Sequence, residues 1–326
     1  MIVPEFWAEG RVQERVQGRQ VTMRRFGWSD TSQDDAQRHA DERAREALTR
    51  LASGQSVARR ERKLSYNGAD GVPIREEILS RHEATVITRN LYGARCLNTP
   101  DVLFADIDFS VVLGPRLGLS VLVLLELGAV AIGWMHDSWV LGLMAAVGGL
   151  LFSHGIATNL LRVFVAWAGG AQERAQGRIR RFCAAHPDWH VRVYRTPAGL
   201  RLLAMHRTFD PADAAVAECF RAVGADPVYV RMCSNQRCFR ARVSPKPWRI
   251  GIGTHIRPRP GVWPVRPERR PERARWIEGY EASARGYASC RLLETLGSSS
   301  QVHPSARAVQ VLHDEMCQAN TMLPMA

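Results

Sequence analysis

The sequence predicts an α+β fold, in which a mixed or antiparallel sheet domain with flanking helices is interrupted by a two-helix transmembrane hairpin. Segments with strand-like alternation of apolar residues occur on both sides of a central apolar region. That region lies between Arg116 and Arg162, and its only formal charges are Glu126 and Asp137. Segments with helix-capping residues accompany the strands, and the 46% apolar content is ample for a packed core.

The composition favours an anionic partner and a reducing compartment. The formal net charge of +12 suits nucleic acid, nucleotide or the inner face of a bilayer, and it does not choose among them. Seven cysteines, odd in number and scattered, are poor material for a disulfide framework. Cys233 and Cys238 have no second pair at metal-ligand spacing, so ordinary buried thiols are expected there.

The central region predicts a membrane hairpin. Its two apolar runs, Leu117–Met135 and Trp139–Leu161, are long enough at ~1.5 Å per residue to cross a ~30 Å hydrocarbon layer. The alternative is a pair of buried helices in a soluble protein. Arginines flank the hairpin on both sides, whereas the connecting turn has none, so both ends are expected in the cytoplasm. The sequence therefore predicts a multi-pass protein of the inner membrane, with the lipid bilayer as its partner.

Four parts of the chain result from this arrangement. They are residues 1–110 as the N-terminal part of a cytoplasmic α+β domain, 111–168 as the hairpin, 169–256 as the C-terminal part of that domain, and 257–326 as a Pro/Arg-rich linker with C-terminal helices. Because both ends of the hairpin return to one side, the two polar parts are expected to fold together.

Before the hairpin, the sequence predicts one long helix and a group of strands. Ser and Asp residues that suit an N-terminus precede residues 33–51, which are rich in good helix formers. Residues 84–109 are typical of strands, with a turn near Asn98 and a last strand over 102–109.

After the hairpin, helices and strands alternate. Residues 170–187 predict a helix, and 189–209 predict two strands joined by the turn "TPAG". The next helix is expected to have Asp210 as its cap, Pro211 at its first position and Gly224 as its stop. A strand over 238–252 follows, and two helices near 272–296 and 304–319 close the chain.

Two carboxylates in "FADIDF" are the first candidate site. In a strand, Asp106 and Asp108 point to one face, while Ala105 and Ile107 pack behind them. Carboxylates this close repel each other unless a cation lies between them, and Mg²⁺ or Mn²⁺ with oxygen ligands is the common solution. The alternative is a solvated strand end with two acids.

A basic strand is the second candidate feature. In "FRARVSPK", apolar residues alternate with Arg240, Arg242 and Ser244, and Lys246 continues the polar face. Guanidinium groups suit forked contacts to a triphosphate. The alternative is a solvated basic strand, although Lys246 is one of only two lysines in the chain.

The order of these features resembles the archaeo-eukaryotic primase superfamily, the primase-polymerases, over roughly residues 85–250 without the hairpin. The resemblance implies that Asp106, Asp108 and a third acid, Asp226, hold two metal ions. It also implies that Arg240 and Lys246 bind the nucleotide triphosphate. The Ser-x-His of that family falls at Gly199-Leu200-Arg201, so Arg201 stands in place of the histidine. An arginine still binds phosphate, so the change weighs against polymerisation more than against nucleotide binding.

The sequence therefore supports two functions. One is a membrane-anchored cytoplasmic protein with a primase-polymerase-like, metal-dependent nucleotide-binding domain and Mg²⁺ or Mn²⁺ as cofactor; if it is an enzyme, it is a metal-dependent nucleotidyltransferase. The other is a non-catalytic, membrane-tethered binding or scaffold protein that uses its basic face for nucleotide, nucleic acid or anionic lipid. The phrases "YRTPAGLRLL" and "CFRARVSPKPWR" are also similar to bacterial membrane proteins, a likeness that implies no activity.

Overall fold

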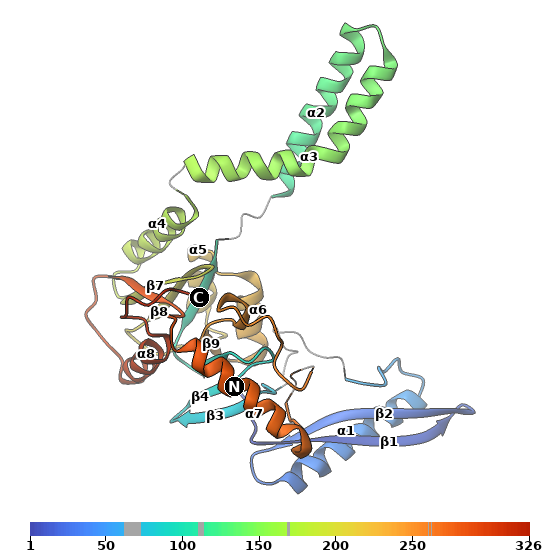
Figure 1. Cartoon of the computed structure of the whole chain (residues 1–326), viewed down its shortest axis with the longest axis vertical. Helices are drawn as coiled ribbons and strands as arrows, with labels where there is room; N and C mark the ends of the chain where they lie inside the picture. The colour runs from blue at the N-terminus through green and yellow to red at the C-terminus, as the bar shows by residue number, and fades with distance from the viewer. Residues whose placement is uncertain (62–72, 110–113, 168–169, 260, 262) are drawn as a thin grey trace.

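A computed structural model describes residues 1–61, 73–109, 114–167, 170–259, 261 and 263–326, with the side chains of 165–167 left out of the description. The expected α+β fold with antiparallel sheets is confirmed, and the strands form one two-stranded and two four-stranded sheets (Figure 1).

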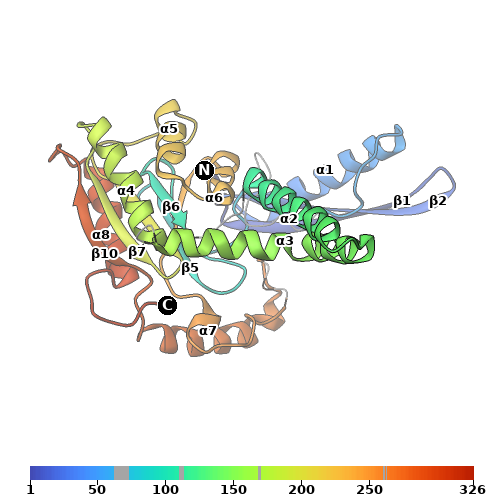
Figure 2. The same cartoon turned by 90° about the horizontal axis from the view of Figure 1, so that it is seen from above.

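The N-terminal unit is a β-hairpin covered by one helix. Strands β1 (Phe6–Val16) and β2 (Arg19–Ser29) pair antiparallel, and α1 (Gln33–Ala52) packs against them through fully buried alanines such as Ala36 and Ala40. The side chain of Ser32 caps α1 by accepting a hydrogen bond from the Asp35 amide at 3.1 Å. The helix agrees with the sequence-based prediction, whereas the hairpin was not predicted. Figures 1 and 2 both show this unit extending away from the side of the molecule that carries α4 and α8.

Two four-stranded sheets join the chain before and after the apolar helices. One has the order β10-β7-β8-β6 and the other the order β3-β4-β5-β9. Their strands are β3 (Glu77–His82), β4 (Thr85–Arg89), β5 (Arg95–Thr99), β6 (Phe104–Asp108), β7 (Val191–Thr196), β8 (Gly199–Ala204), β9 (Phe239–Arg242) and β10 (Arg291–Leu296). Because β6 pairs with β8 and β5 with β9, the two polar parts of the chain assemble into shared sheets.

Five helices and two 3₁₀ turns belong to the second half of the polar region. They are α4 (Gly170–Ala185), α5 (Ala214–Val223), α6 (Pro227–Gln236), η1 (Pro247–Arg249), η2 (Pro267–Arg269), α7 (Arg270–Ala284) and α8 (Pro304–Cys317). One large apolar core contains residues of α4, α5, α6 and α8 together with the inner faces of both sheets.

Two details of the predicted helices are wrong. The helix expected to begin at Pro211 begins at Ala214 with Asp213 as its N-cap, although it does stop at Gly224, whose φ of 72° suits glycine. The helix expected over 272–296 ends at Ala284, and β10 follows it. Residues 291–296 pair with β7, so a tertiary contact overrides local helix propensity there. The C-terminal region is therefore more than a linker with helices, because it supplies an edge strand of the main sheet.

Helices α2 (Pro115–Met135) and α3 (Trp139–Trp167) project from the body of the molecule (Figure 1). Both are long and apolar enough to cross a membrane, and most of their large apolar side chains are exposed. They pack closely at paired glycines, since a Cβ added to Gly133 would lie 3.1 Å from the Cα of Gly142. Exposed apolar surface of this extent is expected where lipid covers a helix pair.

Candidate functional site

The two predicted acids lie on β6, next to β8. Asp106 is opposite Arg201 in the strand register, and Asp108 is opposite Gly199. Ala105 and Ile107 are fully buried on the other face of the strand. A side chain at Gly199 is excluded, because its Cβ would lie 1.9 Å from the carbonyl oxygen of Ile107. The glycine therefore lets β8 approach the end of β6 that carries the carboxylates.

Asp106 forms a bidentate ion pair with Arg201. Its two carboxylate oxygens accept hydrogen bonds from Arg201 Nε at 2.7 Å and from Nη2 at 3.2 Å. The Arg201 side chain is only 3% exposed, and its Nη1 also donates to the carbonyl oxygen of Arg242 at 2.9 Å. Burial alone would disfavour the charged form, but Asp106 outweighs it and holds the pKa of Arg201 above its ordinary value. Arg201 is therefore a buried partner of the acid site.

Asp226 lies beside Asp106 but has a structural task of its own. Its backbone amide donates to the carbonyl oxygen of Asp106 at 2.8 Å. Its carboxylate caps α6 by accepting from the amides of Val228 and Tyr229, each at 3.2 Å. A capping carboxylate keeps lone pairs that could reach a cation.

Asp108 interacts electrostatically with both acids. Partial burial and the neighbouring charges of Asp106 and Asp226 raise the pKa of Asp108, while Lys246 and Arg242 oppose that rise. The structure thus brings the three predicted acids together at the end of β6, with two of the predicted cations nearby.

The cations Arg242 and Lys246 are joined by Arg249, which the sequence analysis did not single out. Burial and repulsion from Arg242 lower the pKa values of both Lys246 and Arg249, although Asp108 partly offsets this. Positive groups held together at such a cost are typical of anion-binding sites.

An aromatic pair borders these cations. The Lys246 ammonium lies 5.4 Å from the ring centroid of Trp248, whose side chain is 55% exposed. The Trp248 ring in turn contacts Tyr92, with 5.2 Å between ring centroids. These two residues were not predicted, because Tyr92 belongs to a loop that is far from Lys246 and Trp248 in the chain. The "KPW" order, with an aromatic two residues after the lysine, was the one available signal.

Arg240 lies in the core, away from solvent. Its guanidinium forms a buried ion pair with Glu76, which also accepts a hydrogen bond from the hydroxyl of Thr88 at 2.6 Å. The Arg240 side chain is 3% exposed, so it does not share the accessible polar face that the sequence predicts for Arg240, Arg242 and Lys246. Arg242 and Lys246 belong to the partly exposed set, whereas Arg240 fixes β9 to the chain that precedes β3.

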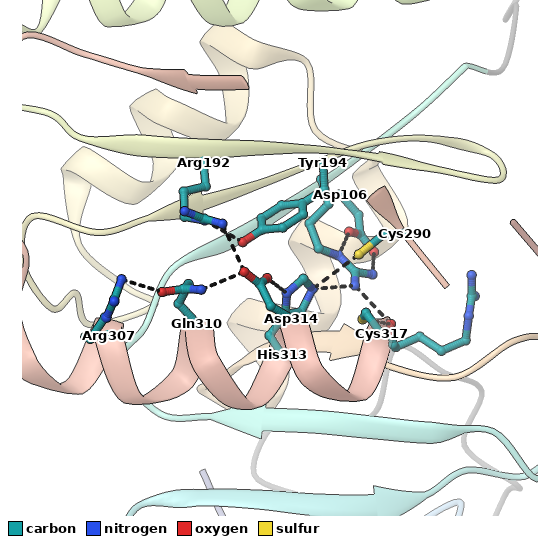
Figure 3. A network of polar contacts seen from close by, with 11 residues as sticks. Asp106, Arg192, Tyr194, Cys290, Arg307, Gln310, His313, Asp314 and Cys317 are labelled. Carbon is teal, nitrogen blue, oxygen red and sulfur yellow. Dashed lines mark hydrogen bonds and ion pairs between the residues drawn. The ribbon is translucent and has the colours of Figure 1, made fainter. Parts of the chain in front are cut away.

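A second cluster lies behind Arg201, at the C-terminal half of α8. Cys290, His313 and Cys317 are buried, and their ligand atoms lie within 4.8 Å of one another (Figure 3). These three side chains form a possible metal-binding triad within the described part of the chain. Cys233 and Cys238, the pair closest in sequence, lie outside this triad. His313 and Cys317, four residues apart in a helical segment, were the missed signal, because that spacing places both on one helix face.

Comparison with known proteins finds no family model, no curated protein and no solved structure that matches this chain. The fold and the sites define it as an α+β protein with two apolar helices long enough to span a membrane and a mixed acidic and basic site at the end of β6.

Proposed function

We propose that this chain is a membrane-anchored cytoplasmic protein whose polar domain binds a nucleoside triphosphate with the help of Mg²⁺ or Mn²⁺. The observation that carries the proposal is the charge arrangement around Asp108. The carboxylates of Asp106, on β6, and Asp226, at the start of α6, lie close enough to Asp108 to raise its pKa beyond the effect of burial. The cations Arg242, at the end of β9, and Lys246, in the segment after β9, lower it. Acids beside phosphate-binding cations suit a metal ion shared by protein and phosphate oxygens.

Asp108 is the best-placed metal ligand of the three acids. Asp106 accepts hydrogen bonds from Arg201, and Asp226 accepts hydrogen bonds from the start of α6, so each has fewer lone pairs left for a cation. Asp108 stands at the exposed end of β6. Its raised pKa reflects partial burial and two negative neighbours, whose charge a divalent cation would neutralise. In this proposal, Asp108 holds the cation and the other two carboxylates complete its surroundings.

The cations and the exposed indole would bind the rest of the nucleotide. Arg242, Lys246 and Arg249 offer donors for phosphate oxygens, and guanidinium groups do this in forked geometry. Trp248 is exposed beside Lys246, so a base could stack on its ring while the phosphates contact the lysine. The aromatic ring favours a nucleotide over inorganic phosphate.

Membrane anchoring is supported by the two exposed apolar helices and by their place in the chain. β6 ends shortly before α2, and β8 follows α3 by way of α4 and β7, yet β6 and β8 are paired neighbours. Both ends of the helix pair therefore return to one domain, which supports a position of that domain on a single side of the bilayer. The arginines that flank the helices favour the cytoplasmic side of the inner membrane for both termini.

A second candidate function is nucleotide, nucleic-acid or anionic-lipid binding without turnover. The Asp106–Arg201 ion pair favours it, because a neutralised Asp106 is a weaker ligand for the second metal ion that nucleotidyl transfer requires. Nucleotidyl transfer itself would need both Asp106 and Asp108 on metal ions, with a 3′-hydroxyl as the nucleophile.

Equilibrium binding of fluorescent nucleoside triphosphate to the full chain in lipid nanodiscs, with and without Mn²⁺, tests the proposal. We expect Mn²⁺ to strengthen binding and Asp108→Asn to remove that dependence. Asp34→Asn, an exposed acid on α1, serves as the matched control and should behave like the wild type. Arg242→Met should weaken binding with or without the metal.

The two candidates give different results in the same assay. If Asp106→Ala with Asp108→Ala leaves binding intact or strengthens it, the site binds anions without a metal. Incorporation of labelled nucleotide into a primer would establish transfer. Absence of any nucleotide binding, with and without Mn²⁺, would contradict the proposed function.

A further inference from the structure

The cluster of Cys290, His313 and Cys317 lies on the sheet side of α8. His313 and Cys317 occupy one face of that helix, and Cys290 comes from the segment just before β10. All three are 0% exposed, and the Sγ of Cys290 lies 3.9 Å from the Nε2 of His313 (Figure 3). Two sulfurs and an imidazole nitrogen gathered in a core are a donor set that suits a soft cation.

We propose that Cys290, His313 and Cys317 bind a zinc ion, which fastens α8 to the sheet behind Arg201. Thiolate and imidazole ligands select zinc or Cu⁺ among the common biological metals, whereas Mg²⁺ and Mn²⁺ prefer oxygen. This site is therefore chemically distinct from the oxygen site at Asp108.

The hydrogen bonds of His313 determine which of its nitrogens carries the lone pair. Its Nδ1 lies 3.0 Å from a carboxylate oxygen of Asp314, and its Nε2 lies 3.3 Å from Nη1 of Arg201. A carboxylate accepts and a guanidinium only donates, so the proton is on Nδ1 and the lone pair is on Nε2. Nε2 also lies 3.9 Å from the Sγ of Cys290, so a metal ion bound there would replace Arg201 as the partner of this lone pair, while Arg201 Nη1 would keep its hydrogen bond to the Arg242 carbonyl oxygen.

Asp314 is itself held firmly, as the outer partner of a metal-bound histidine should be. Its Oδ2 accepts hydrogen bonds from Arg192 Nη2 at 3.0 Å and from Gln310 Nε2 at 2.6 Å (Figure 3). Arg307 continues the network by donating to Gln310 at 3.0 Å. A carboxylate–histidine pair of this kind fixes ring orientation and strengthens the histidine as a ligand.

Charge balance permits a metal ion in this part of the core. Arg201 is already neutralised by Asp106, so a zinc ion with two thiolates and a neutral imidazole adds no net charge to the core. Three protein ligands leave one coordination position, but burial of all three closes the cluster to a substrate. The role that fits is structural, since the three ligands join the segment before β10 to α8, beside the hydrogen bond from the Ser289 amide to the Cys317 carbonyl oxygen at 2.9 Å.

Metal analysis of the full chain, purified in detergent without chelators, tests the site. Inductively coupled plasma mass spectrometry should find about one zinc ion per chain. Cys317→Ser and His313→Asn should lose it, whereas Cys219→Ser and Cys233→Ser, which change buried cysteines elsewhere, should retain it. Asp108→Asn should retain it too, so the outcome is independent of the proposed nucleotide site. Stoichiometric copper in place of zinc would overturn the choice of metal.

Two measurements on the wild-type chain keep the test valid if a variant fails to fold. Cobalt added to chelator-treated protein should give the near-ultraviolet absorption of sulfur-to-cobalt charge transfer. Alkylation followed by mass spectrometry should show that zinc protects Cys290 and Cys317 selectively. A Cys290–Cys317 disulfide in protein purified without reductant, or the absence of both metal and cobalt absorption, would overturn the proposal.

Discussion

The carboxylate of Asp106 and the guanidinium of Arg201 are paired at 2.7 Å across neighbouring strands β6 and β8. The arginine also donates to the main chain of β9 and to His313. One side chain thus connects the acid site, the basic strand and the Cys290–His313–Cys317 cluster. The guanidinium of Arg201 therefore has a structural role in the fold.

Removal of Arg201 should destabilise the protein strongly. Arg201→Met leaves Asp106 without its buried partner, and loss of one member of a buried pair costs about 3–5 kcal/mol. Chemical denaturation in detergent, followed by tryptophan fluorescence, measures the change in the free energy of unfolding. Arg38→Met, which breaks the exposed Arg38–Asp35 pair on α1, is the control and should cost less than about 1 kcal/mol. Equal effects of the two changes would contradict the buried role of Arg201.

Trp248→Ala should weaken nucleotide binding while leaving the fold intact. Stacking of a base on an aromatic ring contributes about 1–3 kcal/mol, which corresponds to roughly 5- to 150-fold in affinity. Trp248→Phe should recover most of the loss because it retains an aromatic face. Affinities from the nanodisc assay decide this, and an unchanged dissociation constant for Trp248→Ala would exclude stacking at this ring.

Gly199→Ala should disturb the end of β6. The added Cβ would lie 1.9 Å from the Ile107 carbonyl oxygen, so the two strands must separate next to Asp108. We expect a large loss of stability together with weaker metal dependence of nucleotide binding. Gly279→Ala is the matched control, since no atom other than the nearby backbone of α7 itself and the adjacent residues lies within 4 Å of its added Cβ. That change should stabilise by about 0.5–1 kcal/mol. Similar melting temperatures for the two variants would refute the close approach.

His206 should make stability depend on pH. Burial lowers its pKa in the folded protein, while Asp188, His190 and Arg207 are the charged or titratable groups that also act on it. The unfolded chain then binds more protons below about pH 6.5, so this contribution is complete above that pH and is lost as pH falls through the lowered folded pKa.

Unfolding curves at pH 7.5 and pH 5 measure this effect. His206→Phe should reduce the loss of stability between the two values, because the new ring still packs against Trp189, which lies 4.8 Å from the His206 ring centroid. The exposed His255→Phe should retain the wild-type pH dependence. An unchanged pH dependence in His206→Phe would show that the imidazole is not responsible.

The topology of the apolar helices can be tested with single added cysteines. Asp137→Cys, in the turn between α2 and α3, should react with a membrane-impermeant maleimide added to intact cells. Ser53→Cys, after α1, should react only once the membrane is opened. The native cysteines among the described residues are buried and give a low background. Labelling of both positions from outside would refute a cytoplasmic domain.

Local sequence signals predicted the elements that depend only on residues of their own segment. The capped helix α1, the strands around "TPAG" and the apolar helices all follow from periodicity, turn residues and length. Hairpin β1–β2 was missed because its strands carry many charged residues, and β10 was missed because it forms only against β7.

The site was predictable to a similar extent. Strand alternation predicted Asp106 and Asp108 on one face of their strand, and Arg242 and Lys246 on the polar face of the basic strand. The structure brings the two groups together. Sequence could not show that Arg240 is paired with Glu76 or Arg201 with Asp106, because those partners come from distant segments. The same reason explains why the cluster around Cys290 remained hidden.

The pairing of β6 with β8 has a consequence for biosynthesis. β6 is an edge strand whose one sheet neighbour is β8, and both apolar helices are translated before that neighbour exists. In the anchored protein that we propose, the insertion machinery would therefore receive α2 and α3 while the backbone of β6 is still unpaired. The later segments would then leave the ribosome already tethered at the bilayer surface, close to the strand that they must complete.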